Sequence, residues 1–154
     1  MYKANSFLVD YGTVRKLIAV AVILLFIDYL IGVEINLFVA IPQQTALSFF
    51  GYTGGVEVLA HIATGIMIVI VALAILASSI KLNNTFLSTL SLLALAFIVG
   101  AAGDGALFLL LGQQNTYSMT MAIGFVSAFI VYFFEVIEVG RPHVSKNFEA
   151  RQEG

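Results

Sequence analysis

The segment that decides the fold is residues 17–40, LIAVAVILLFIDYLIGVEINLFVA, an apolar run with only two acidic interruptions. It exceeds the ~20 residues that an α-helix needs to cross ~30 Å of hydrocarbon. Three further apolar runs of sufficient length follow at 56–78, 86–111 and 119–139. The runs are continuous and not alternating, which excludes barrel strands. The sequence therefore predicts an all-α, polytopic membrane four-helix bundle that forms a single transmembrane domain over residues 1–154.

The composition agrees with a membrane protein. Hydrophobic residues make up 60% of the chain and charged residues 10%, so a soluble domain would leave much apolar surface uncovered. The expected solvent is the lipid bilayer. The chain has no cysteine, which excludes disulfides, iron–sulfur clusters and thiolate metal sites. No basic patch of the kind that binds nucleic acid is present.

The basic residues predict the topology. They all flank the runs or lie in the break between the second and third runs: Lys3, Arg15, Lys16, Lys81, Arg141, Lys146 and Arg151. Loops 41–55 and 112–118 contain neither Lys nor Arg. Because cytoplasmic loops are enriched in Lys and Arg, we expect both termini in the cytoplasm of a multi-pass cell-membrane protein. Residues 1–16 would be an interfacial lead-in, and residues 140–154 a short cytoplasmic tail.

Ionisable side chains inside the spans are the first candidates for function, because burying them in lipid is costly. At ~1.5 Å per residue, Asp28 falls near the middle of the first span. Glu34, Glu57, His61 and Asp104 fall in the outer half of the bilayer. We expect His61, Glu57 and Asp104 to point together into a protected interior. Asp28, Glu34 and Asp104 are candidates for handling protons or cations, with simple hydrogen bonding of Asp28 to a neighbouring hydroxyl as the alternative.

Glu57 and His61 are four residues apart, so both project from one helical face. Gly65 is next on that face and leaves space beside the imidazole. His61 is predicted to be either an interhelical hydrogen-bond donor or a ligand and proton-handling group. Met119 and Met121 begin the last span at a comparable depth. Methionine there can simply fill the core, but a His and a Met together are also an axial pair for haem iron.

Two other groups of residues have a structural interpretation. Small residues cluster on two spans, and they favour close helix packing or clear room for a flat ligand: Gly100, Ala101, Ala102, Gly103, Gly105, Ala106, Ala122, Gly124, Ser127 and Ala128. Glu135 and Glu138 lie beside Arg141 at the inner end of the last span. They are predicted to be a solvated interfacial pair.

Part of the chain, about residues 55–135, resembles a four-helix half of haem A synthase. Glu57 followed by His61 is similar to the family's E-x-x-H-R motif, with one additional residue and Ile62 in the Arg position. The run Gly105-Ala106-Leu107-Phe108, followed by Gly112, is similar to the end of the family's third helix, and Met121 falls near its second ligand histidine. The resemblance implies a haem cofactor with His61 as axial ligand, Met121 or Met119 as a possible second ligand, and Glu57 as a catalytic carboxylate.

Three functions follow as hypotheses. The first is a haem-binding membrane protein in haem modification or electron transfer, which would make it an oxidoreductase of a respiratory chain. The second is a proton- or cation-conducting subunit that uses the carboxylates inside the membrane. The third is an accessory subunit of a respiratory or oxidase complex. The small-residue faces further predict a homodimer or assembly with other membrane subunits.

Overall fold

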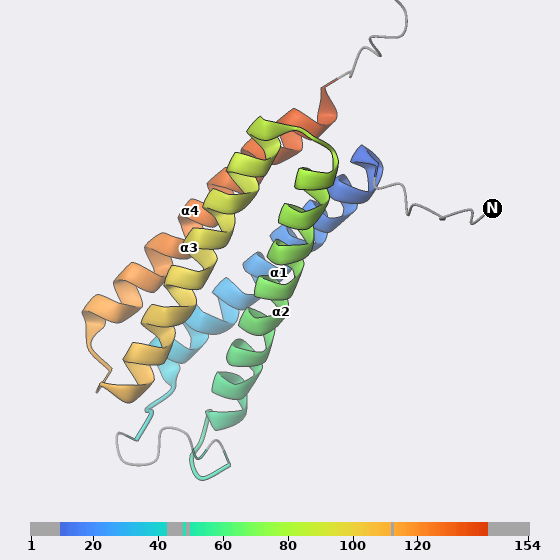
Figure 1. The fold of residues 1–154 in the computed structure, drawn as a ribbon. Helices are drawn as coiled ribbons and strands as arrows, with labels where there is room; N and C mark the ends of the chain where they lie inside the picture. The colour runs from blue at the N-terminus through green and yellow to red at the C-terminus, as the bar shows by residue number, and fades with distance from the viewer. Residues whose placement is uncertain (1–9, 43–47, 49, 112, 142–154) are drawn as a thin grey trace, which may run out of the picture.

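The computed structural model describes residues 10–42, 48, 50–111 and 113–141. Four helices follow one another up and down: α1 (Tyr11–Phe38), α2 (Gly55–Lys81), α3 (Thr85–Leu110) and α4 (Asn115–Gly140) (Figure 1). Each is long and apolar enough to cross a membrane, and the described residues contain no strand. The prediction of an all-α membrane four-helix bundle is confirmed. The chain is an integral membrane protein whose outer surface contacts lipid.

The helix boundaries follow from their capping residues. α1 begins at Tyr11 and not at residue 17, because the Asp10 carboxylate accepts a hydrogen bond from the Thr13 N–H at 2.6 Å. Residues 11–16 of the predicted lead-in are therefore helical and continuous with the first span, while residues 1–9 and 142–154 lie outside the described part. The break between the second and third apolar runs is a short turn between α2 and α3. There the Asn84 side chain accepts from the Leu87 N–H at 3.0 Å and caps α3.

The helices form a ring. Each packs against its sequence neighbours, and α4 closes against α1. Across the diagonals no Cα atoms of the described residues lie within 8 Å of one another, but the His61 ring of α2 and the Phe125 ring of α4 meet with their centroids 6.2 Å apart. α3 and α4 approach closely at Gly124, where a Cβ would lie 3.0 Å from the Ala101 Cβ and 3.1 Å from the Phe97 carbonyl oxygen. Small residues thus bring these two backbones together. A Cβ on Gly100 or Gly103 would meet nothing within 4 Å, so these two glycines take no part in this packing.

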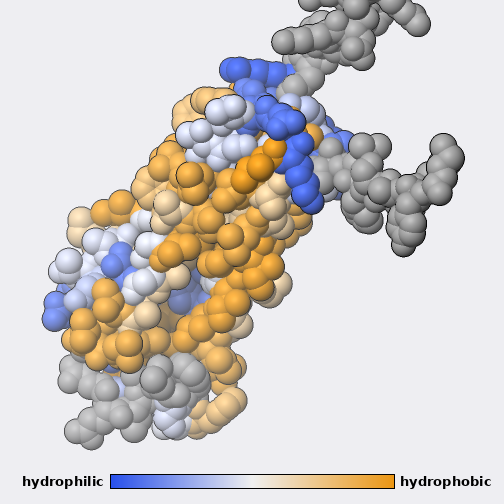
Figure 2. Space-filling model, in the orientation of Figure 1, coloured by the Kyte–Doolittle hydropathy of each residue, from blue (hydrophilic) through white to orange (hydrophobic). Residues whose placement is uncertain are grey.

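The two ends of the bundle differ in charge. Asp10, Arg141 and the α2–α3 turn lie at one end, here called the termini end, and the α1–α2 and α3–α4 connections lie at the other, the loop end (Figure 1). Figure 2 shows hydrophilic residues gathered at the termini end above a hydrophobic flank. The described basic residues belong to that end: Arg15, Lys16, Lys81 and Arg141.

Candidate functional site

The centre of the site is a side-chain pair that joins α1 to α2. The His61 Nδ1 lies 2.8 Å from the Asp28 Oδ1. The Asp28 side chain is 1% exposed and the His61 side chain 18% exposed. The sequence places both residues within the membrane, but it favours Glu57 as the carboxylate near His61. Asp28 is 33 residues away in sequence, and only the packing of α1 against α2 brings it there.

The pair lies at the wall of an apolar cavity of about 480 Å³, within the ~300–1,000 Å³ typical of ligand sites. The cavity lies between two helical hairpins, one formed by α1 and α2 and the other by α3 and α4. It occupies the half of the bundle near the loop end, and all four helices line it. Figure 1 looks between α2 and α3 onto α1, and in the same orientation Figure 2 shows a hollow with hydrophilic atoms at its base. Ile66, Ala102 and Ala106 line the cavity and are also exposed on the outer surface. The hollow thus faces the lipid.

The hydrogen bond to Asp28 leaves the second ring nitrogen of His61 unused. An ionised carboxylate only accepts hydrogen bonds, so opposite ionised Asp28 the hydrogen sits on Nδ1. Nε2 has no hydrogen-bond partner in the part of the chain that the structure describes. Gly32 lets the ring lie close to α1, since a Cβ there would be 3.2 Å from the His61 Cε1. In a neutral ring, Nε2 is then an acceptor or a metal ligand.

Asp28 keeps one oxygen without a partner. Oδ2 is buried and forms no hydrogen bond with any described residue. Gly65, which also lines the cavity, lies beside it, and a Cβ there would be 3.9 Å from Oδ2. The space that Gly65 leaves therefore lies over the Asp28 carboxylate, and the glycine nearest the imidazole is Gly32. A buried carboxylate with an unsatisfied oxygen next to a cavity is a feature that functional sites show more often than packing cores.

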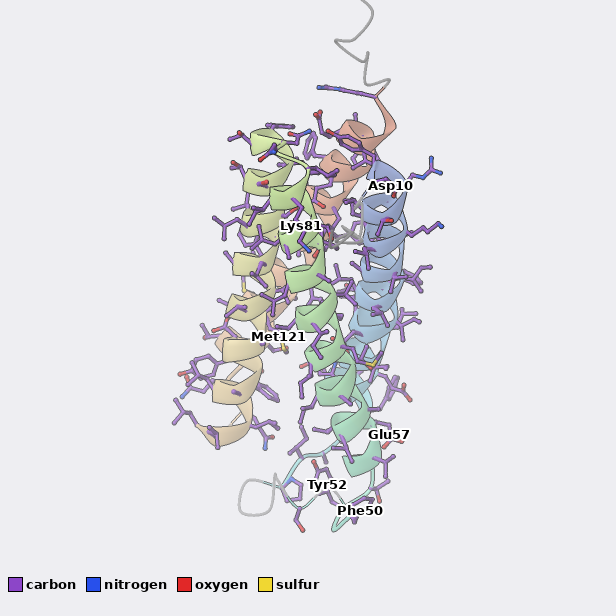
Figure 3. All side chains as sticks on the ribbon, turned by 45° about the vertical axis from the view of Figure 1, so that its right-hand side comes forward. Asp10, Phe50, Tyr52, Glu57, Lys81 and Met121 are labelled. Atoms are coloured by element: carbon purple, nitrogen blue, oxygen red, sulfur yellow. The ribbon has the colours of Figure 1, made fainter. Side chains whose placement is uncertain are left out.

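The two methionines differ sharply. Met121 lines the cavity together with His61, and its sulfur lies 3.2 Å from the place of a Cβ on Gly105. Figure 3 shows the Met121 side chain directed into the space between the hairpins. Met119 is 66% exposed and does not line the cavity. Of the two thioethers, only the sulfur of Met121 is placed where it could act on a cavity ligand.

The other predicted site residues lie away from the cavity. Glu57 is exposed and projects away from the space between the hairpins (Figure 3), and Glu34 is also exposed. Asp104 is half-buried on α3, and none of these three carboxylates lines the cavity. His61, Glu57 and Asp104 are therefore not brought together. Among the described residues, no three His, Cys, Asp or Glu side chains gather as they would around a metal ion.

The prediction for Glu135 is wrong. Glu138 does form the expected surface ion pair, with its Oε2 2.9 Å from the Arg141 Nη1. Glu135, one turn earlier, is 0% exposed. It falls on the buried stripe of α4 that also contains Gly124, Ala128 and Tyr132. The three- and four-residue spacing of these positions could have placed Glu135 on the buried face of α4. The sequence-based interpretation instead followed the nearness of Glu135 to Arg141 in the chain.

Comparisons with known protein families, with curated proteins and with solved structures find no match to this chain. The function must therefore be inferred from the chemistry of the cavity. That chemistry consists of one imidazole with a free nitrogen, one buried carboxylate that orients it, one thioether and an apolar lining with a lipid-facing mouth.

Proposed function

We propose that the protein is a membrane haem protein whose cavity holds haem through the Nε2 of His61. The observation that carries this proposal is the 2.8 Å contact between His61 Nδ1 and Asp28 Oδ1 at the cavity wall. A metal-ligating histidine almost always donates its other ring N–H to a carboxylate, a carbonyl or water. The Asp28–His61 pair has that arrangement without any further residue being needed.

Asp28 would serve two purposes in such a site. Its Oδ1 fixes the ring orientation and the Nδ1–H tautomer, and its negative charge increases the basicity of the imidazole. A carboxylate at 1% exposure also requires a nearby positive charge. Bound ferric haem would supply one-electron redox chemistry, and its iron would bring such a charge to the cavity.

The remaining cavity residues suit an apolar, planar group. Gly65 leaves one wall open, and Gly105 makes room for Met121, which offers a thioether from α4. Asn36 and Ser118 line the same cavity and are joined by a 3.1 Å hydrogen bond from the Ser118 hydroxyl to the side-chain carbonyl oxygen of Asn36. These are uncharged partners, so acidic groups of a bound haem would have to remain in contact with water near the loop end.

Absorption spectroscopy of the protein purified from haem-supplied cells tests this proposal. We expect a Soret band that His61→Ala abolishes or shifts. Met121→Ala should shift the spectrum or the reduction potential if the thioether is the second ligand, whereas Met119→Ala, a matched change at an exposed position, should alter neither. A colourless wild-type protein, or an unchanged spectrum in His61→Ala, would refute haem ligation by His61.

The activity built on such a cofactor would be electron transfer or oxidation of the haem itself, as an oxidoreductase of a respiratory chain. Glu57 would have no acid–base role in this activity, because its side chain is exposed and outside the cavity. The four described basic residues at the termini end favour the cytoplasm for that end of the protein in a cell membrane. Reaction of added cysteines with an impermeant thiol reagent, at residues 53 and 83 in turn, would test this orientation.

A second candidate function is that of an accessory subunit in a membrane complex, and Asp104 favours it. The half-buried Asp104 carboxylate has no hydrogen bond to any described residue. The adjacent Gly100 and Gly103 leave the surface of α3 open, which would admit a helix of a second copy or of another subunit. Isolation in mild detergent tests this. Loss of an oligomer in Asp104→Leu, with the wild-type oligomer intact, would support it, and a monomeric wild type would refute it.

A conducting subunit is favoured less. Ion or proton passage needs polar groups along the route. Between the Asp28 level and the polar cluster of Ser79, Ser91 and Glu135 near the termini end, a layer of buried hydrophobic side chains interrupts such a route: Ile18, Ala21, Leu25, Ile68, Ala72, Ile75, Ala94, Ala128 and Val131. Proton flux into liposomes that Asp28→Asn abolishes would revive this hypothesis.

A further inference from the structure

A second buried polar cluster lies at the termini end, at the opposite end of the bundle from the cavity. Glu135 of α4 is 0% exposed, Ser91 of α3 is 1% exposed and Ser79 of α2 is 0% exposed. The Ser79 Oγ and Ser91 Oγ lie 3.0 Å apart, and the Ser91 hydroxyl is next to the Glu135 carboxyl. One residue from each of three helices therefore meets in the core.

Nothing in the described part of the chain neutralises a charge on Glu135. Neither of its carboxyl oxygens has a hydrogen-bond partner of good geometry. On α4 itself, Arg141 is paired with Glu138, and Tyr132 is buried one turn earlier. On the facing helices, the titratable residues near this end are the capping Asp10, Arg15 and Lys16 of α1 and Lys81 of α2, which are all exposed, and Tyr11 of α1, which is half-buried; α3 has none near this end.

We propose that Glu135, with Ser91 and Ser79, forms a proton-binding site within the membrane-spanning bundle. The carboxyl group holds a proton, which it donates to the Ser91 Oγ. The Ser91 hydroxyl donates to the Leu87 carbonyl oxygen at 2.9 Å, and the Ser79 hydroxyl donates to the Ile75 carbonyl oxygen at 2.9 Å. Both serine hydroxyls thus already have acceptors on their own helices, which leaves the Ser91 Oγ available to accept from the protonated carboxyl group.

Loss of that proton would change the packing of three helices. An ionised carboxylate only accepts hydrogen bonds, so the Ser91 hydroxyl would have to turn away from the Leu87 carbonyl oxygen toward Glu135. The negative charge would still lie in a dry core without a cation, which proteins tolerate poorly. Protonation of this site therefore couples the packing of α2, α3 and α4 to pH.

The test compares Glu135→Gln with Glu138→Gln, a matched change one turn away in the exposed ion pair. Infrared spectra of the wild type at neutral pH should contain a protonated-carboxyl C=O band that Glu135→Gln removes and Glu138→Gln retains. Because the folded state then binds one more proton than the unfolded state, wild-type stability should fall as the pH rises from about 5 to about 8. Glu135→Gln should flatten this dependence relative to both other proteins.

Each outcome decides the proposal. Gln is the neutral isostere of the protonated acid, so Glu135→Gln should assemble and be at least as stable as the wild type at neutral pH. Failure of this variant to fold, a loss of stability at neutral pH, or a pH dependence as steep as that of the wild type would each overturn the proposal. Absence of a carboxyl band that depends on Glu135 would also overturn the proposal.

Discussion

Alanine at Gly124 should destabilise the bundle, whereas alanine at Gly100 of the adjoining helix should not. A Cβ on Gly124 would lie 3.0 Å from the Ala101 Cβ and 3.1 Å from the Phe97 carbonyl oxygen. Ordinary carbon contacts are ~3.5–4.0 Å, so α3 and α4 would have to separate by roughly 0.5–1 Å at this level. The obstacle includes backbone, which cannot rotate away as a flexible side chain would. Overpacking of this kind costs ~1–3 kcal/mol.

The Gly100 variant isolates that cost. Both substitutions gain the higher helix propensity of alanine, ~1 kcal/mol, but a Cβ on Gly100 meets nothing within 4 Å. The difference in unfolding free energy between the two variants should therefore be ~1–3 kcal/mol, with Gly124→Ala the less stable. Steric-trap unfolding in bicelles measures both values. Equal stabilities, or a more stable Gly124→Ala, would show that α3 and α4 do not approach as the structure has them.

Three further predictions concern the helix ends and their connections. Asn84→Ala should lower the unfolding free energy by about 1 kcal/mol because α3 loses its cap, and an unchanged value in the same assay would contradict that role. Gly54→Ala should be strongly destabilising, since Gly54 has φ of +89° and a Cβ would lie 2.6 Å from both terminal methyl groups of Val39. Adding Val39→Ala should recover only part of the loss, because an alanine in the left-handed conformation itself costs ~1–2 kcal/mol. Full recovery of stability would show that this backbone cost is absent. Hydrogen bonds from Thr13 hold the pKa of the Asp10 carboxyl below its ordinary value. The stabilisation from ionised Asp10 should therefore be complete at any pH above the ordinary pKa, and it should be lost as the pH falls through the lowered pKa of the folded protein. Asp10→Asn keeps a capping side chain and should remove this acid-dependent loss, which melting temperatures measured against pH would show.

The fold could be predicted from the sequence because its determinants are local. Four apolar runs of membrane length and a polar break at 81–85 place every helix and the α2–α3 turn. The start of α1 was missed because a single aspartate, Asp10, caps a helix that extends through residues 11–16, where Val14 is the one aliphatic side chain. Such an extension depends on cap geometry and not on hydropathy.

The site could be predicted only in part. Depth along a helix follows from residue number, so Asp28, His61 and Met121 are candidates from the sequence alone. Rotation about each helix axis and the partner across the interface depend on packing, and these decide which candidates meet. His61 therefore bonds to Asp28 on another helix and not to Glu57 on its own, and Met121 faces the cavity while Met119 faces outward.

The short connection between α2 and α3 acts as a hinge, so a small tilt there produces a large displacement at the cavity mouth. Only Leu82, Asn83 and Asn84 separate these helices, and they lie at the far end of the bundle from the mouth. His61 is about 30 Å along α2 from that connection, so a tilt of about 2° at the turn moves the wall of the mouth by about 1 Å. Small changes of angle at the charged end would thus widen and narrow the cavity mouth. Stiffening the turn should therefore slow exchange of any occupant with the bilayer.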